Sequence, residues 1–64
     1  MGDFKATFVK AAGLEETFLG SRDLDADTLE AASIEALACP RPAEANMIDL
    51  YREGQKVDRI GIAL

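Results

Sequence analysis

The sequence predicts an α+β fold with the element order ββαββ, in which one helix packs on one face of a four-stranded antiparallel sheet. Three stretches of the chain support this prediction. Residues 3–21 and residues 47–64 each have the pattern of a β-hairpin, and residues 25–39 between them have the pattern of one helix. The 64 residues are expected to form a single domain, 1–64, near the lower size limit for folding without disulfides or metal.

The first hairpin begins with a strand in which apolar and polar residues alternate. Phe4, Ala6 and Phe8 share one face, because successive side chains of a strand point to opposite faces. We place the turn at Ala12-Gly13, where the glycine can adopt a positive φ, and residues 14–20 return as the second strand. This turn predicts two cross-strand pairs, Lys10 with Glu15 and Ala6 with Leu19.

The helix is bounded by recognisable signals at both ends. Asp27 and Glu30 have the three-residue spacing of a capping box, with aspartate in place of the usual serine or threonine. Pro40-Arg41-Pro42 ends the helix, because proline lacks a backbone N–H and restricts the residue before it.

Two faces of the helix differ in the size of their apolar residues. The larger residues fall on one stripe, which we expect to cover the sheet: Ala26, Leu29, Ser33, Ile34 and Leu37. The opposite face carries Ala31, Ala32 and Ala36. Those alanines are either good helix formers in solvent or a close-packing contact surface, and the pattern leaves both interpretations open.

The second hairpin is predicted to contain strands at residues 46–52 and 56–63, joined by the three-residue loop Glu53-Gly54-Gln55. A loop of this length predicts that Ile48 faces Ile60, that Asn46 faces Ile62 and that Asp49 faces Arg59. Other loop lengths shift the register, and the sequence does not decide between them.

The charge balance favours a protein partner over a nucleic acid. Twelve acidic and seven basic residues give a net charge of −5. A negative domain repels phosphate backbones, so direct nucleic-acid binding is not expected, whereas a basic protein surface would attract it. Solubility alone is the other explanation for this charge. The apolar runs are short and broken by charges, so we expect neither a membrane span nor a signal peptide. A single cysteine, Cys39, fits the cytoplasm.

The residue types exclude most catalytic chemistry. The chain has no histidine, so Ser-His-Asp and Cys-His catalysis and histidine-ligated metal sites are excluded. One cysteine cannot hold zinc or an iron–sulfur cluster by itself. Glu15 and Glu16 are neighbours on a strand and point to opposite faces, so they cannot act as a carboxylate pair. We therefore expect no cofactor and no enzymatic activity.

One helix covers only one face of a four-stranded sheet, so the second face must meet solvent or a partner. The predicted register places Val9 and Phe18 on this second face, away from Phe4 and Phe8. The apolar residues expected there are Val9, Leu14, Phe18, Met47, Tyr51 and Val57. A contiguous apolar patch with acidic residues around it is typical of a protein interface, and a homodimer through this face is an alternative use for it.

The chain resembles two groups of small proteins. One consists of uncharacterised bacterial domains whose second hairpin has a similar pattern, here Ile48-Asp49-Leu50-Tyr51, Gly54 and Lys56-Val57-Asp58-Arg59. The other is the anti-CRISPR proteins of phages, many of which are short acidic α+β folds without catalytic apparatus.

The anti-CRISPR resemblance implies an inhibitor that acts in the host cell cytoplasm. Its carboxylates would occupy the Lys/Arg groove of a CRISPR-Cas complex and block target DNA binding. The densest acidic run available for this role is Asp23, Asp25, Asp27 and Glu30, whose other explanation is a favourable interaction with the helix dipole. Further candidate contacts are Glu15, Glu16 and Asp58, together with the aromatic residues Phe18 and Tyr51. The alternative function is a bacterial or virion structural domain that dimerises through the open sheet face.

Overall fold

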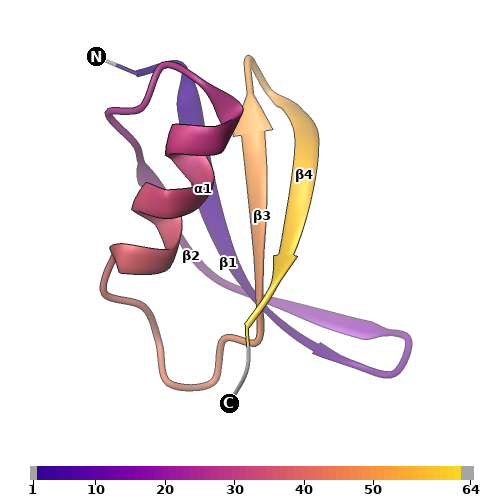
Figure 1. Ribbon diagram of the computed structural model, residues 1–64. Coiled ribbons are helices and arrows are strands. Elements are labelled where there is room, and N and C mark those ends of the chain that lie inside the picture. Colours follow the sequence, from indigo (N-terminus) through magenta and orange to yellow (C-terminus); the bar gives the residue numbers. More distant parts are fainter. Residues whose placement is uncertain (1, 63–64) are drawn as a thin grey trace.

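The computed structural model describes residues 2–62 and has the predicted α+β architecture with the order ββαββ (Figure 1). The four strands form one antiparallel sheet in the order β2-β1-β3-β4. The single helix lies against the central strands on one face of this sheet (Figure 1). The elements are β1 (Phe4–Ala12), β2 (Glu15–Asp23), α1 (Leu29–Ala38), β3 (Met47–Arg52) and β4 (Gln55–Gly61).

The helix contacts the sheet through its alanines, so the predicted stripe of larger residues was wrong. Ala32 and Ala36 are fully buried, whereas Leu29, Ile34 and Leu37 are exposed. The sheet supplies the bulk of the core through large side chains, and an alanine face lets the helix lie close to them. The core cluster comprises Phe4, Ala6, Phe8, Leu24, Ala32, Ala36, Ala45, Ile48 and Leu50.

The turn of the first hairpin is Gly13-Leu14, one residue later than predicted. Gly13 has a φ of +63°, as a glycine at the first position of a two-residue turn allows. The predicted pairs are therefore wrong: Lys10 pairs with Thr17, and Ala6 pairs with Arg22. A register shift between Phe8 and Val9 makes Leu19 an extra residue in β2 and pairs Val9 with Phe18, so the predicted shared face of those two residues is confirmed.

The second hairpin keeps the predicted register although its loop is shorter. The turn contains only Glu53 and Gly54, both with positive φ (53° and 81°), and such a turn matches the twist of a hairpin. A register shift between Leu50 and Tyr51 compensates for the missing loop residue. Ile48 therefore pairs with Ile60, Asp49 pairs with Arg59, and Asn46 accepts a 2.9 Å hydrogen bond from the amide of Ile62. The predicted extension of the last strand to Ala63 lies outside the described residues.

The helix begins one residue later than the capping-box prediction. Thr28, not Asp27, is the N-cap, and its hydroxyl accepts a hydrogen bond from the amide of Ala31 at 3.2 Å. A different acidic residue of α1 fixes the segment that precedes the helix. The Glu35 carboxylate accepts hydrogen bonds of 2.9–3.0 Å from the amides of Asp25 and Ala26, and so holds the link between β2 and α1 against the helix.

Near its turn, the β1–β2 hairpin is fixed to the start of β3 by a side chain that acts as a strand residue. The Asn46 side chain accepts a hydrogen bond from the amide of Ala11 and donates one to its carbonyl, both at 2.8 Å. A side-chain amide thus extends the β1–β3 ladder beyond the first residue of β3.

The reversal of the helix face predicts that the same substitution has very different effects at two alanines of α1. Ala36→Leu should lower the free energy of unfolding by about 1–3 kcal/mol, because a larger side chain cannot fit between the helix and the sheet. Ala31→Leu, at an exposed position of the same helix, should change it by less than about 0.5 kcal/mol. Urea unfolding followed by circular dichroism measures both. If Ala36→Leu were as stable as the natural chain, the close packing of α1 would be refuted.

Candidate protein-binding surface

The face of the sheet that the helix leaves uncovered, here called the open face, is mixed in character. Cross-strand partners point to the same side of a sheet, so the register identifies its members. They are Glu16, Phe18, Ser21 and Asp23 of β2; Lys5, Thr7, Val9 and Ala11 of β1; Met47, Asp49 and Tyr51 of β3; and Lys56 and Arg59 of β4. The apolar residues predicted here are thus interrupted by charged ones. Leu14 lies in the turn and is fully exposed, and Val57 lies at the bulge of β4.

A cluster of four charged side chains occupies one part of the open face. Asp49 is only 4% exposed, and its carboxylate accepts hydrogen bonds from the Arg59 guanidinium at 2.6 and 3.0 Å. The same guanidinium donates to both carboxylate oxygens of Glu16 at 2.7 and 2.9 Å. Lys56 Nζ lies 3.7 Å from Asp49. Arg59 of the edge strand β4 therefore reaches over the sheet to the opposite edge strand β2.

This cluster changes the ionisation of its members. Hydrogen bonds from Arg59 lower the pKa of Asp49, although burial acts in the opposite direction. The same guanidinium lowers the pKa of Glu16, and the two carboxylates together raise the pKa of Arg59. Glu16 and Asp49 are therefore neutralised by basic neighbours within the chain.

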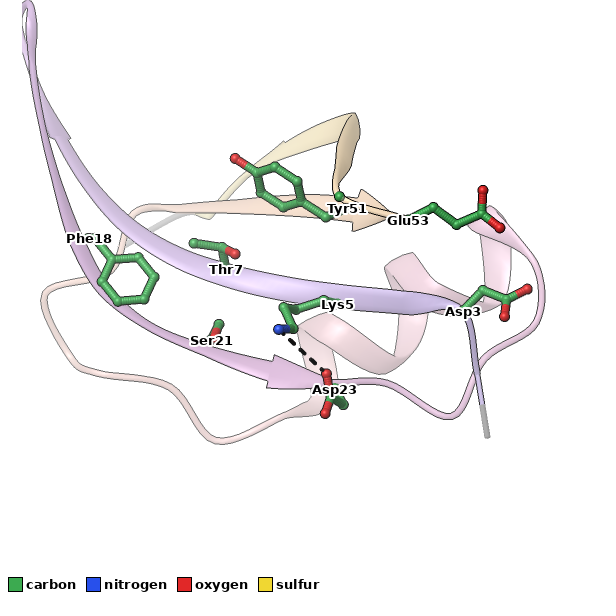
Figure 2. A pocket seen from close by; sticks show the side chains of 9 residues that line it. Asp3, Lys5, Thr7, Phe18, Ser21, Asp23, Tyr51 and Glu53 are labelled. Atoms are coloured by element: carbon green, nitrogen blue, oxygen red, sulfur yellow. Dashed lines mark ion pairs between the residues drawn. The ribbon is translucent and has the colours of Figure 1, made fainter.

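A hollow of about 400 Å³ lies on the open face beside this cluster. Phe18 of β2 and Tyr51 of β3 stand on its two flanks, and Thr7 of β1 lies between them (Figure 2). Phe18 is 66% exposed, which is unusual for a large aromatic side chain, and Tyr51 is half-buried. The hollow is lined by Asp3, Lys5, Thr7, Phe18, Ser21, Asp23, Tyr51, Glu53 and Gly54.

One end of this hollow is acidic. Antiparallel pairing brings the start of β1, the ends of β2 and β3 and the start of β4 to the same end of the sheet, and the link to α1 runs past it (Figure 1). This end, here called the acidic end, carries Asp3, Asp23, Asp25, Asp27, Glu30 and Glu53. All six are exposed. Two basic residues partly balance them: Lys5 lies 3.9 Å from Asp23, and Arg52 lies 3.7 Å from Asp3.

The structure brings some of the predicted contact residues together and separates others. Phe18, Tyr51 and Asp23 line one hollow (Figure 2), and Asp25, Asp27 and Glu30 continue from it along the acidic end. Glu16 is engaged by Arg59, and Asp58 accepts a hydrogen bond of 2.8 Å from the backbone amide of Arg59. Glu15 lies beside the β1–β2 turn, at the other end of β2.

Sequence reasoning missed Asp3, Lys5, Thr7, Ser21 and Glu53 as parts of this site. The alternation of β1 contained a signal for two of them, because it places Lys5 and Thr7 on the face opposite Phe4, Ala6 and Phe8. Asp3 and Glu53 had no such signal, since they join the site only through the strand order.

Across residues 2–62, no group of three acidic or cysteine side chains is arranged to hold a metal ion. Within the same residues, α1 falls short of the length and hydropathy that a membrane-crossing helix needs. Comparisons with protein-family models, with curated proteins and with solved structures find no match to this chain.

The buried carboxylate predicts a defined pH dependence of stability. Asp49→Asn should lower the free energy of unfolding at pH 7 by about 1–3 kcal/mol, because a buried charge pair loses its anionic partner. The folded pKa of Asp49 lies below the ordinary value of 3.8, so its contribution is complete above that pH and is lost as the pH falls through the lower folded pKa.

The difference between the natural chain and Asp49→Asn should therefore shrink as the pH falls below 3.8 and through the lower folded pKa of Asp49. Urea unfolding at a series of pH values measures it, and Asp58→Asn serves as an exposed control. A difference that did not shrink as the pH fell below 3.8 would contradict the role of the Asp49 carboxylate.

Proposed function

We propose that this chain is a non-enzymatic protein-binding module whose acidic end and open-face hollow dock on a basic surface of a nucleic-acid-binding complex. A phage inhibitor of the anti-CRISPR type is the specific function proposed, with a CRISPR-Cas complex as its partner in the cytoplasm of the host cell. The supporting observation is that an exposed aromatic residue, a second aromatic residue and a row of carboxylates share one site.

The hollow has the chemistry to take a lysine or arginine side chain of the partner. The methylenes of such a side chain would lie between Phe18 and Tyr51, whose ring faces attract a cation. The charged head would then reach the carboxylates of Asp3, Asp23 and Glu53. A volume of about 400 Å³ suits one or two long side chains rather than a folded element.

The acidic end extends this contact over a wider surface. Glu35 fixes the backbone at Asp25 and Ala26, so the carboxylates of Asp25 and Asp27 project from an ordered segment. Preorganised carboxylates can replace a row of phosphates on a Lys/Arg groove, with little loss of conformational entropy on binding. The charge of −5 would speed association, and added salt would weaken it.

The combined substitution Asp23→Asn, Asp25→Asn and Asp27→Asn tests the acidic end. We expect the natural chain to prevent purified CRISPR-Cas complexes from binding target DNA in a gel-shift assay, with an affinity that falls as salt rises. The triple variant should bind about three- to hundredfold more weakly, since each exposed charge pair contributes about 0.2–1 kcal/mol. Glu15→Gln combined with Glu44→Gln is the control away from the acidic end. Equal inhibition by the triple variant, or no inhibition of any complex by the natural chain, would refute the proposal.

Two single substitutions test the hollow with a short Arg/Lys-rich peptide as the probe. Phe18→Ala should weaken binding about three- to tenfold, because one aromatic flank is lost. Lys5→Gln should strengthen it by a similar factor, because Lys5 competes for Asp23 at 3.9 Å. Isothermal titration calorimetry measures both, and Val57→Ala is the control at an exposed apolar residue outside the hollow. Weaker binding by Lys5→Gln would indicate that the peptide binds elsewhere.

The alternative function, a structural domain that dimerises through the open face, makes different predictions. Phe18→Asp would then convert a dimer into a monomer in light scattering, and salt would have little effect on either species. That result, together with a failure to bind basic complexes, would favour the alternative.

A further inference from the structure

The outward flank of α1 is apolar and has no partner within the described chain. Leu29 is 41% exposed, Leu37 47% and Ile34 66%, and Ser33 lies between them. The other flank of the helix faces the β2–α1 link, where Glu35 holds Asp25 and Ala26. The residues Leu29, Ser33, Ile34 and Leu37, here called the outer flank, follow one another at helical spacing and carry no charge.

We infer that a second copy of this chain covers the outer flank, with the two α1 helices packed antiparallel. An interface between identical copies must be complementary to itself, which a strip of like charge on a chain of net charge −5 could not be. The outer flank meets this requirement because it is uncharged and the charged residues beside its two ends have opposite signs. Glu30 lies at the N-terminal end and Arg41 at the C-terminal end.

The position of Arg41 makes the antiparallel arrangement specific. Its guanidinium donates a hydrogen bond of 3.0 Å to the carbonyl of Leu37, so the charge lies beside the last turn of the helix. Glu30 precedes Leu37 by seven residues, two helical turns, and so lies on the same side. An antiparallel second helix centred on Ser33 and Ile34 therefore places Glu30 of each copy opposite Leu37 of the other, beside the guanidinium of Arg41.

The centre of the outer flank suits a close helix crossing. In the same arrangement Leu29 of each copy lies opposite Leu37 of the other, and Ser33 and Ile34 lie at the two-fold axis. The Ser33 hydroxyl already donates to the carbonyl of Leu29 at 3.0 Å, so its hydrogen is satisfied without a partner. The small side chain of Ser33 allows the two backbones to approach each other at the crossing, and Ile34 supplies the apolar contact beside it.

The small area of the helix–helix contact predicts a weak dimer. A stable interface buries about 800 Å² per partner, roughly a fifth of the 4308 Å² that this chain exposes. A helix of ten residues provides less than that, so the dimer is expected to dissociate with a Kd in the range of about 1–100 μM.

This dimer leaves the hollow free, because α1 and the hollow lie on opposite faces of the sheet (Figures 1 and 2). Glu30 is the one residue of the acidic end that also belongs to the dimer contact. Both hollows of the dimer remain open and point outward. If the proposed function also holds, the dimer would present two binding sites to one partner complex.

Sedimentation equilibrium between about 1 μM and 1 mM tests the inference, over the range where such a Kd would show. The natural chain should shift from 6.9 kDa to twice that mass as its concentration rises. Ile34→Asp should associate at least about thirtyfold more weakly than the natural chain. Phe18→Asp is a matched control, because Phe18 has the same 66% exposure but lies on the open face, and it should dimerise like the natural chain. A natural chain that stayed monomeric at 1 mM, or a dimer lost in Phe18→Asp and kept in Ile34→Asp, would overturn the inference.

Charge exchange tests the antiparallel pairing directly. Glu30→Arg and Arg41→Glu should each weaken the dimer about three- to thirtyfold, since each replaces two attractive pairs with two repulsive ones. The double variant should recover most of the lost affinity, and circular dichroism checks that all variants keep the fold. Failure of the double variant to recover affinity, with the fold intact, would refute the antiparallel arrangement.

Discussion

The close contact between the alanine face of α1 and the two central strands is the constraint on which the rest of the structure depends. Ala32 and Ala36 are fully buried against a sheet that supplies Phe4, Phe8 and Leu50. Small side chains on the helix leave room for large ones on the strands, and a chain of 64 residues has few of either. The larger residues of the helix are consequently directed outward, where they form the outer flank. The position of that exposed surface thus follows from the packing of the core.

On the other side of the sheet, the buried carboxylate of Asp49 determines how the charges of the open face are arranged. A buried charge must be paired, and Arg59 pairs it from β4 while also binding Glu16 of β2. The open face therefore combines a self-neutralised charged cluster with a hollow flanked by Phe18 and Tyr51. The exposed carboxylates of the acidic end lie outside this cluster. The proposed contact with a basic partner depends on them.

The sites proposed for partner binding and for self-association share only Glu30, which lies at the edge of both. The acidic end and the hollow belong to one face and one end of the sheet, whereas the outer flank belongs to the helix on the other face (Figure 1). Their chemistry differs as well, since salt weakens contacts between exposed charges but has little effect on apolar ones. Substitutions at Ile34 and at Phe18 can therefore assign an observed association to one site.

The sequence alone determined the element order and the face that Phe4, Ala6 and Phe8 share, because period-two alternation directly reports which side of a strand a residue occupies. It also placed Phe18 and Tyr51 correctly on the open face. Tertiary structure decided the rest. The helix had two apolar faces, and only packing against the sheet could select Ala32 and Ala36 over Ile34. The acidic end joins residues from the start of β1, the end of β2 and the β3–β4 turn, and the strand order β2-β1-β3-β4 that gathers them leaves no local pattern in the chain.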